Sequence, residues 1–125
     1  MVERDGRFLM IRRADHLEDA PGYWTPTGGR IEPGESPEQA VVREMAEEVG
    51  VVVRPLRALA ETDSAAGDYR LHWWLAEITS GEARPSCDEV AELRWLTLHE
   101  LRAMEPVFAQ DLEVMERSLG GESCE

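Results

Sequence analysis

The order of apolar and polar positions divides the chain into strands, loops and helices that do not alternate strictly. The mostly apolar run 7–12 predicts a central strand, because a strand covered on both faces needs no polar side. Residues 69–78 form the strongest strand pattern and are rich in aromatic side chains. Shorter strands are expected at 51–53, 56–61 and 93–96, with Pro55 ending the first of them. This mixture predicts an α/β fold in which helices pack on a mixed β-sheet.

One predicted helix has clear signals at both ends. Ser36 is a suitable N-cap, Pro37 suits the first helical position, and Gln39 completes a capping box with Ser36. Apolar residues recur inside the helix at a spacing of four, which gives one buried stripe. Gly50 is the expected stop, because glycine readily takes the left-handed conformation that ends a helix.

Two further helices are expected towards the C-terminus. Thr97 and Glu100 form a second capping box, which opens a short helix to about residue 104. An amphipathic pattern then predicts a last helix that ends at Gly120. We therefore expect a single domain over residues 1–119 and a frayed polar tail over 120–125.

Composition and charge narrow the function. The chain has 125 residues and a formal net charge of 13 − 26 = −13, which disfavours general nucleic-acid binding. The basic residues are all arginine, which excludes Schiff-base chemistry and a lysine-dependent phosphate loop. Two cysteines make neither a disulfide framework nor a zinc site. Without an apolar run long enough for a membrane or a secretory signal, we expect a cytoplasmic protein with no membrane association.

Three carboxylates gather on the helix that begins at Ser36. Glu44, Glu47 and Glu48 are three and four residues apart, so they project from one side of the helix. Arg43 can pair with Glu47, but one arginine cannot neutralise three carboxylates. The set can be a solvated acidic face or an oxygen-ligand site for Mg²⁺ or Mn²⁺. On mutual repulsion alone, neutralising Glu44 and Glu48 together is expected to stabilise the metal-free protein.

The residues around this helix resemble a known family signature. From Gly29 through Glu35 to Arg43–Val51, the sequence follows the Nudix box, G-x5-E-x7-R-E-U-x-E-E-x-G-U with U a bulky aliphatic residue. Every fixed position of the box is filled. The approach to the box ends in Thr27 before Gly28, where many relatives of this family have proline.

The resemblance implies a Nudix-type α/β/α sandwich, with a mixed β-sheet between helices. It implies metal-dependent hydrolysis of a nucleoside diphosphate linked to another moiety X, by attack of a metal-activated water at phosphorus. The implied cofactor is Mg²⁺ (or Mn²⁺), and the implied substrate is a small nucleoside diphosphate derivative.

Roles carry over from the resemblance to the matching positions. Glu44, Glu47 and Glu48 resemble the metal-binding and base-providing carboxylates, and the Gly28 carbonyl would offer a further metal ligand. Arg43 would orient the glutamates by ion pairing. Structural roles are implied for Gly29, Glu35 and Gly50. A further acidic metal ligand is expected from a loop; Glu89 is the candidate, with Asp88 and Glu92 as rivals.

Other residues than the box carboxylates are candidates for substrate contacts. Arg12, Arg13, Arg30 and Arg70 could bind phosphate, although an arginine in such a position is more often merely solvated. Trp24 could stack on a base. Trp73 and Trp74 are neighbours on one strand, so their rings face opposite sides of the sheet.

Two other function classes stay open. One is a non-catalytic Nudix-fold module that binds nucleotide or regulates; complete carboxylates disfavour it. The other is an isoprenoid diphosphate isomerase, which the box resembles less closely. The sequence does not choose X among oxidised nucleotides, dinucleoside polyphosphates, nucleotide sugars and ADP-ribose. A shortened sheet edge near the start of the chain could be completed by a second copy, which allows a homodimer.

Overall fold

The computed structural model describes residues 1–28, 31–63, 67 and 70–123. The strands and helices that it contains are, in chain order, β1 (Glu3–Arg4), β2 (Arg7–Arg13), β3 (Trp24–Pro26), α1 (Pro37–Val49), β4 (Val52–Asp63), β5 (Arg70–Ser80), β6 (Val90–Thr97), α2 (Leu98–Arg102) and α3 (Ala109–Ser123). None of the helices in these ranges has the length and apolar character needed to cross a membrane.

Strand β2 is the centre of the larger sheet, as its apolar run predicted. It pairs antiparallel with β1, with β3 and, along its other edge, with β6. The ladder with β6 runs from the Arg7–Thr97 pair to the Arg13–Val90 pair, with one register shift near Arg13. Both faces of β2 are covered, so its side chains from Phe8 to Ile11 are buried.

Strands β4 and β5 form a second, two-stranded antiparallel ladder. The prediction that Pro55 separates two strands is wrong, since β4 runs through it as one strand. The pairing shifts register between Pro55 and Arg57, and such a bulge accommodates a residue that has no N–H to donate. The loop predicted at 63–68 lies largely outside the described residues.

The first two residues connect the two ladders. The Ala76 N–H donates to the Met1 carbonyl at 2.9 Å, and the Leu9 N–H donates to the Val2 carbonyl at 3.0 Å. Val2 and Ala76 form an isolated parallel bridge, whereas the paired strands named above are antiparallel. The parallel component of the predicted mixed sheet is therefore small.

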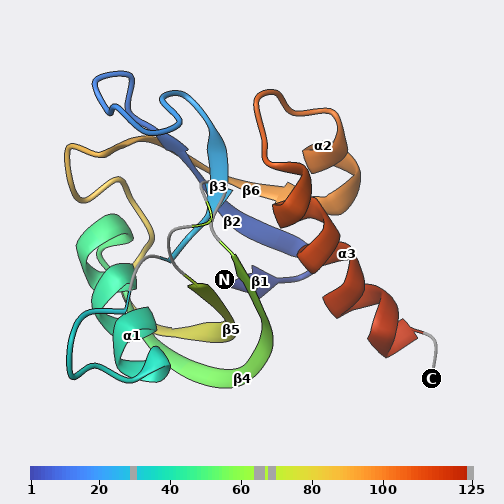
Figure 1. Ribbon diagram of the computed structural model, residues 1–125, viewed down its shortest axis with the longest axis horizontal. Coiled ribbons are helices and arrows are strands. Elements are labelled where there is room, and N and C mark those ends of the chain that lie inside the picture. Colours follow the sequence, from blue (N-terminus) through green and yellow to red (C-terminus); the bar gives the residue numbers. More distant parts are fainter. Residues whose placement is uncertain (29–30, 64–66, 68–69, 124–125) are drawn as a thin grey trace.

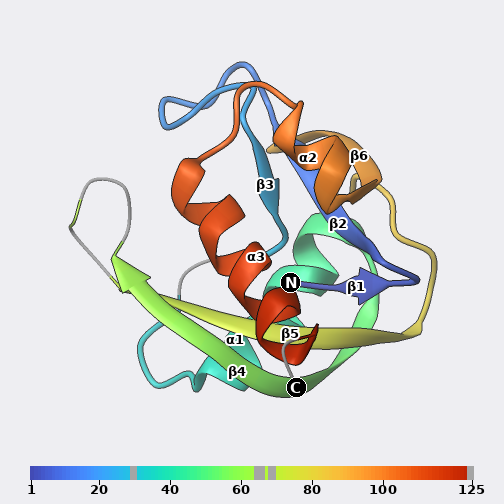
Figure 2. The same cartoon turned by 90° about the vertical axis from the view of Figure 1, so that its right-hand side faces the viewer.

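Helices cover the two faces of this strand layer, which confirms the predicted layered α/β fold. Figure 1 shows α1 on one side of the strands and α2 with α3 on the other, and Figure 2 shows α3 in front of them. The α1-side core contains Val2, Leu9, Ile11, Val41, Met45, Val49, Val51, Val53, Ala76 and Val90. The α3-side core contains Met1, Phe8, Met10, Trp24, Trp73, Leu96, Leu101, Val114 and Met115.

The alternation of side chains along a strand explains this division. On β2, Phe8 and Met10 enter the α3-side core, whereas Leu9 and Ile11 enter the α1-side core. On β5, Trp73 belongs to the α3-side core and Trp74 packs against the α1-side core. The two tryptophans thus face opposite sides, as predicted, and both contribute to packing.

The ends of α1 follow the local sequence signals. The Ser36 hydroxyl accepts from the Gln39 N–H at 3.1 Å, and the Gln39 side chain accepts from the Ser36 N–H at 2.8 Å. At the other end Gly50 takes the left-handed conformation, with φ 70°. Met45 and Val49 are fully buried, so this helix is held tightly by its apolar stripe.

The C-terminal helices agree with the prediction except at the last end. The capping box of Thr97 and Glu100 is present at the start of α2. Helix α3 continues to Ser123, so the expected end at Gly120 is wrong. Glycine is only a weak stop inside a helix, because its penalty is about 1 kcal/mol relative to alanine.

Candidate active site

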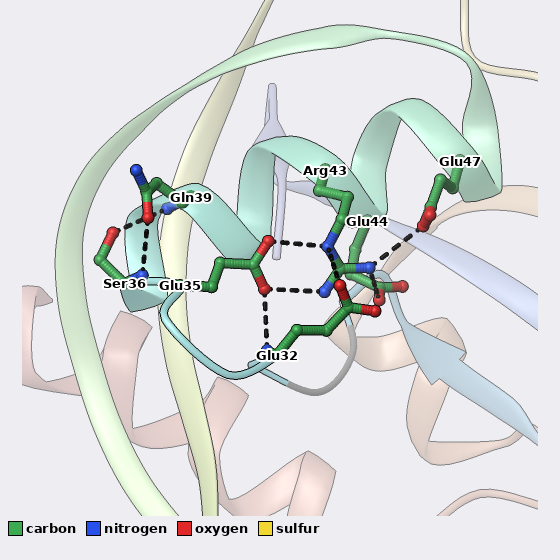
Figure 3. Close-up of polar contacts among 7 residues, drawn as sticks. All are labelled: Glu32, Glu35, Ser36, Gln39, Arg43, Glu44 and Glu47. Carbon is green, nitrogen blue, oxygen red and sulfur yellow. Dashed lines mark hydrogen bonds and ion pairs between the residues drawn. The ribbon is translucent and has the colours of Figure 1, made fainter.

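Arg43 is the centre of a carboxylate cluster on the exposed side of α1 (Figure 3). Its Nε and Nη2 donate to the two oxygens of Glu35, at 2.7 and 3.0 Å. Its Nη1 donates to Glu44 at 2.6 Å and to Glu47 at 3.1 Å. Glu32 lies 3.7 Å from its Nε. A planar guanidinium can hold several carboxylates in a fixed arrangement, which a lysine ammonium cannot do.

Glu35 joins the loop before α1 to the helix itself. Besides the two contacts with Arg43, one of its oxygens accepts from the Glu32 N–H at 2.9 Å. The hydrogen bonds from Arg43, and then that from Glu32, lower the pKa of Glu35. The carboxylate thus stays charged and ties the loop to the middle of α1, which fits the structural role expected for it.

Glu44 has a positively charged partner and does not simply repel the neighbouring carboxylates. Only 17% of its side chain is exposed, and it is ion-paired with Arg43. The expectation that neutralising Glu44 and Glu48 together would stabilise the metal-free protein therefore needs correction for Glu44. Removing that charge would leave the Arg43 guanidinium with an unfilled donor, which offsets any relief from repulsion.

Glu48 lies in a different environment from the other two glutamates. Its carboxylate accepts from the Gly28 N–H at 3.2 Å, and no ion pair to it is present among the described residues. Burial raises its pKa to about 8; the Gly28 hydrogen bond opposes this shift and the charge of Glu44 adds to it. The site thus contains one carboxylate that holds a proton near neutral pH when no metal is bound.

A loop that sequence reasoning did not connect with the box covers the C-terminal end of α1. The Arg84 N–H donates to the Val49 carbonyl at 3.0 Å, and the Ser86 N–H donates to the Glu48 carbonyl at 2.9 Å. An added Cβ on Gly50 would lie 3.1 Å from the Arg84 Nη1. Gly50 therefore serves both the left-handed turn and this close approach. No sequence signal showed that the loop of Arg84 and Ser86 lies beside α1.

Among the described arginines considered for phosphate binding, Arg13 is the one whose charge acts on Glu48. It follows Leu9 and Ile11 in the alternation of β2, on the side of α1. Its positive charge lowers the pKa of Glu48, although less than the N-terminal ammonium of Met1 does. Its Nε also donates to the Asp19 carbonyl at 3.0 Å, which fixes the side chain. The sequence offered Arg13 only as one of four equivalent arginines.

The other predicted substrate contacts have different surroundings. Arg12 pairs with Glu92 at 3.4 Å and with Asp15 at 3.5 Å. Arg70 pairs with Asp63 at 3.2 Å at the open end of the β4–β5 hairpin. Trp24 is 5% exposed within the α3-side core, so a base could reach little of it, and its stacking role stays a prediction. Arg30 and Gly29 lie outside the described residues.

The candidate acids near the start of β6 have partners other than the box carboxylates. Glu89 is exposed, and its carbonyl accepts from the Ala14 N–H at 2.9 Å. Asp88 lies 4.0 Å from His16. Glu92 is held by Arg94 and Arg12, and these hydrogen bonds lower its pKa. The role of Glu89 as a further metal ligand thus stays a prediction.

The comparisons with known proteins were made on the whole chain. The sequence model of the NUDIX domain matches residues 1–117. The chain belongs to the Nudix family. Its similarity to the NAD-capped RNA hydrolase NudC of Stutzerimonas stutzeri is 36% identity over 99 residues, which are 79% of this chain and 35% of that relative. The chain therefore spans about a third of the length of the curated relatives it matches.

Solved Nudix structures agree with the fold. The MutT NUDIX hydrolase from Burkholderia pseudomallei has a TM-score of 0.67 and 32% identity, and covers 92% of this chain and 90% of its own. The E. coli ORF135 protein has a TM-score of 0.76 and 26% identity, over 100% of this chain and 88% of its own.

The donor set suits a hard divalent cation. Glu44, Glu47, Glu48 and the Gly28 carbonyl offer oxygen ligands only, which Mg²⁺ and Mn²⁺ prefer. As the side chains lie, no three acidic, histidine or cysteine groups in the described ranges form a finished metal cluster. Arg43 holds one oxygen of Glu44 and one of Glu47, and the Gly28 N–H holds one of Glu48, so a cation would share these carboxylates with their present partners.

We predict that Arg43→Gln destabilises the metal-free protein by about 2 to 4 kcal/mol, because it leaves several partly buried carboxylates without their cation. Arg102→Gln is the matched control: it breaks an exposed pair with Glu116 and should change stability by about 1 kcal/mol or less. Urea unfolding of both variants in chelator measures the difference. Equal effects of the two substitutions would contradict the central place of Arg43.

We also predict that Glu48 makes the metal-free protein less stable as the pH rises. Its pKa is raised in the folded state from 4.5 to about 8, so stability is present below the unfolded pKa and is lost between about pH 4.5 and 8. Glu48→Gln removes this component and should stabilise the protein at pH 8 by on the order of 2 kcal/mol relative to pH 5.

Urea unfolding in chelator across this pH range tests the second prediction. If Glu48→Gln and the parent lose stability with pH in the same way, a group other than Glu48 carries the dependence.

Proposed function

We propose that this chain is a Nudix pyrophosphohydrolase that cleaves the diphosphate linkage of a nucleoside diphosphate derivative. The observation that carries the proposal is the complete carboxylate set of α1, held by Arg43 and Glu35, with a half-buried Glu48 beside it. In a helix with only a structural role, the mutual repulsion of so many acidic groups around one guanidinium would bring no benefit.

A divalent cation would be held by Glu44, Glu47, Glu48 and the Gly28 carbonyl, with Glu89 as a further ligand. When bound, it supplies charge neutralisation at the phosphate oxygens and a lowered pKa of an attacking water. Glu48 is the base we favour, because a bound cation would lower its raised pKa and leave its carboxylate free to accept the proton of that water. Arg43 acts on the glutamates and orients their carboxylates.

The substrate is negatively charged and the protein has a net charge of −13, so the two repel each other overall. The positively charged groups near the site therefore determine where the substrate binds. Arg13 is on the α1 side of β2 and acts on Glu48, which makes it the phosphate contact that we favour among the described arginines. Arg12 and Arg70 are already paired with carboxylates and are weaker candidates.

The relatives suggest where to begin with substrates. Several matched relatives are named NAD-capped RNA hydrolases, so an NAD-type dinucleotide is the first diphosphate to test. The acidic surface argues against binding of a long RNA backbone. A cytoplasmic location and a homodimer stay predictions of the sequence.

We expect turnover of at least one compound in a panel of NAD, ADP-ribose, nucleotide sugars, dinucleoside polyphosphates and oxidised nucleotides, only with Mg²⁺ or Mn²⁺. Glu44→Gln and Glu48→Gln should each lose about two orders of magnitude or more in rate. Glu92→Gln should keep the parent rate, since Glu92 is held by two arginines away from the box. Product analysis by chromatography is the measurement.

Two results would contradict this proposal. Equal turnover in chelator would exclude the metal-dependent mechanism, and a Glu48→Gln enzyme of parental rate would exclude the residue roles. Nucleotide binding without any turnover would indicate the non-catalytic module instead.

We expect Arg13→Gln to raise KM for the best diphosphate about 10- to 100-fold, because a charged hydrogen bond to phosphate is worth about 1.5 to 3 kcal/mol. The neighbouring Arg12→Gln removes the same charge from the protein and should change KM less than about threefold. Steady-state kinetics at fixed ionic strength separates the two. Equal effects would show that net charge, and not the position of Arg13, governs binding.

A further inference from the structure

Thr27 carries a buried hydroxyl that has no hydrogen-bond partner. The residue is 4% exposed, and its Oγ1 is the one buried side-chain polar atom left unpaired in the part of the chain that the structure describes. Folded proteins pair nearly all such atoms, because an unpaired buried hydroxyl loses its bonds to water and gains nothing in return. The position thus carries a penalty that the metal-free fold does not explain.

The backbone on the N-terminal side of Thr27 is fixed by the sheet. Pro26 ends β3 and is paired in register with Met10 of the central strand. Proline also fixes its own φ angle, so the chain enters Thr27 in one direction. The backbone that enters Thr27 is therefore held by the sheet, and its hydroxyl can change position only by rotation of the side chain.

The backbone on the other side leads directly to the box. Gly28 follows with φ 143°, a conformation that glycine adopts readily, and its N–H donates to the Glu48 carboxylate at 3.2 Å. The peptide group between Thr27 and Gly28 therefore contacts Glu48. A shift of that carboxylate towards a cation would act on the Gly28 N–H, and so on the peptide group that follows Thr27.

We propose that Thr27 is a positioning residue of the cation site, whose hydroxyl gains its hydrogen bond only when the site is loaded. The partner is an oxygen of the loaded site, either the Glu48 carboxylate or a cation-bound water. The hydroxyl is unpaired in the metal-free protein and paired in the loaded one, so it favours the loaded state. This inference rests on the proposed function, because it needs a divalent cation at Glu48.

The test is binding of Mn²⁺ alone, measured by isothermal titration calorimetry at fixed ionic strength, together with thermal melting in chelator. Thr27→Val keeps the shape of the side chain and removes the hydroxyl. It should raise the melting temperature of the metal-free protein by about 3 to 6 °C. It should also weaken Mn²⁺ binding about tenfold, and Thr27→Ser, which restores the hydroxyl, should restore the affinity.

Thr62→Val is the matched control. The Thr62 hydroxyl accepts from the Trp73 side chain at 2.8 Å and from the Gln110 side chain at 2.7 Å, away from the box. Its removal should lower the melting temperature and leave Mn²⁺ binding unchanged. The opposite signs of the two threonine variants distinguish an unpaired hydroxyl from a paired one.

The results separate this inference from the proposed function. If Glu48→Gln binds Mn²⁺ as the parent does, the cation site itself is wrong and both fail. If Glu48→Gln loses binding but Thr27→Val binds like the parent, only the role of Thr27 is overturned. A Thr27→Val protein that melts lower than the parent in chelator would show a partner in the metal-free state, such as a fixed water, and would also overturn it.

Discussion

The bidentate ion pair between Arg43 and Glu35 is the interaction on which the candidate site depends. It joins the loop before α1 to the middle of the helix, at distances of 2.7 and 3.0 Å. Because both partners are partly buried, their geometry is better defined than that of an exposed pair. The same guanidinium also donates to Glu44 and Glu47. One side chain therefore sets the positions of the loop and of two carboxylates that we propose as metal ligands.

This arrangement explains how one helix tolerates three acidic groups on one side. Glu44 and Glu47 share a cation, which replaces their mutual repulsion by attraction to a common centre. Glu48 forms no ion pair in the described structure, and burial raises its pKa so that it holds a proton more strongly. The three carboxylates are therefore chemically unequal before any metal binds, although the sequence presents them as a uniform cluster.

The strand layer contributes through the alternation of its side chains. Adjacent residues on β2 enter opposite layers, so Arg13 extends the α1 side while Arg12 joins a surface network with Glu92 and Asp15. The loop at Arg84 and Ser86 supplies the hydrogen bonds that the end of α1 lacks. Segments far apart in the sequence thus complete the surroundings of one helix end, where Glu48 lies.

The sequence by itself determined the features that depend on neighbours a few residues apart. These are the limits of α1, both capping boxes, the central position of β2 and the box with its Nudix resemblance, since caps and periodicity act over one or two turns. Only the tertiary structure decided that β4 continues through Pro55, because a bulge against β5 accommodates it. It also decided that Trp24 is core, that the charge of Arg13 acts on Glu48 and that the Thr27 hydroxyl is unpaired. Burial and charge contacts of this kind arise between segments that meet only when the sheet and helices pack, so no local pattern encodes them.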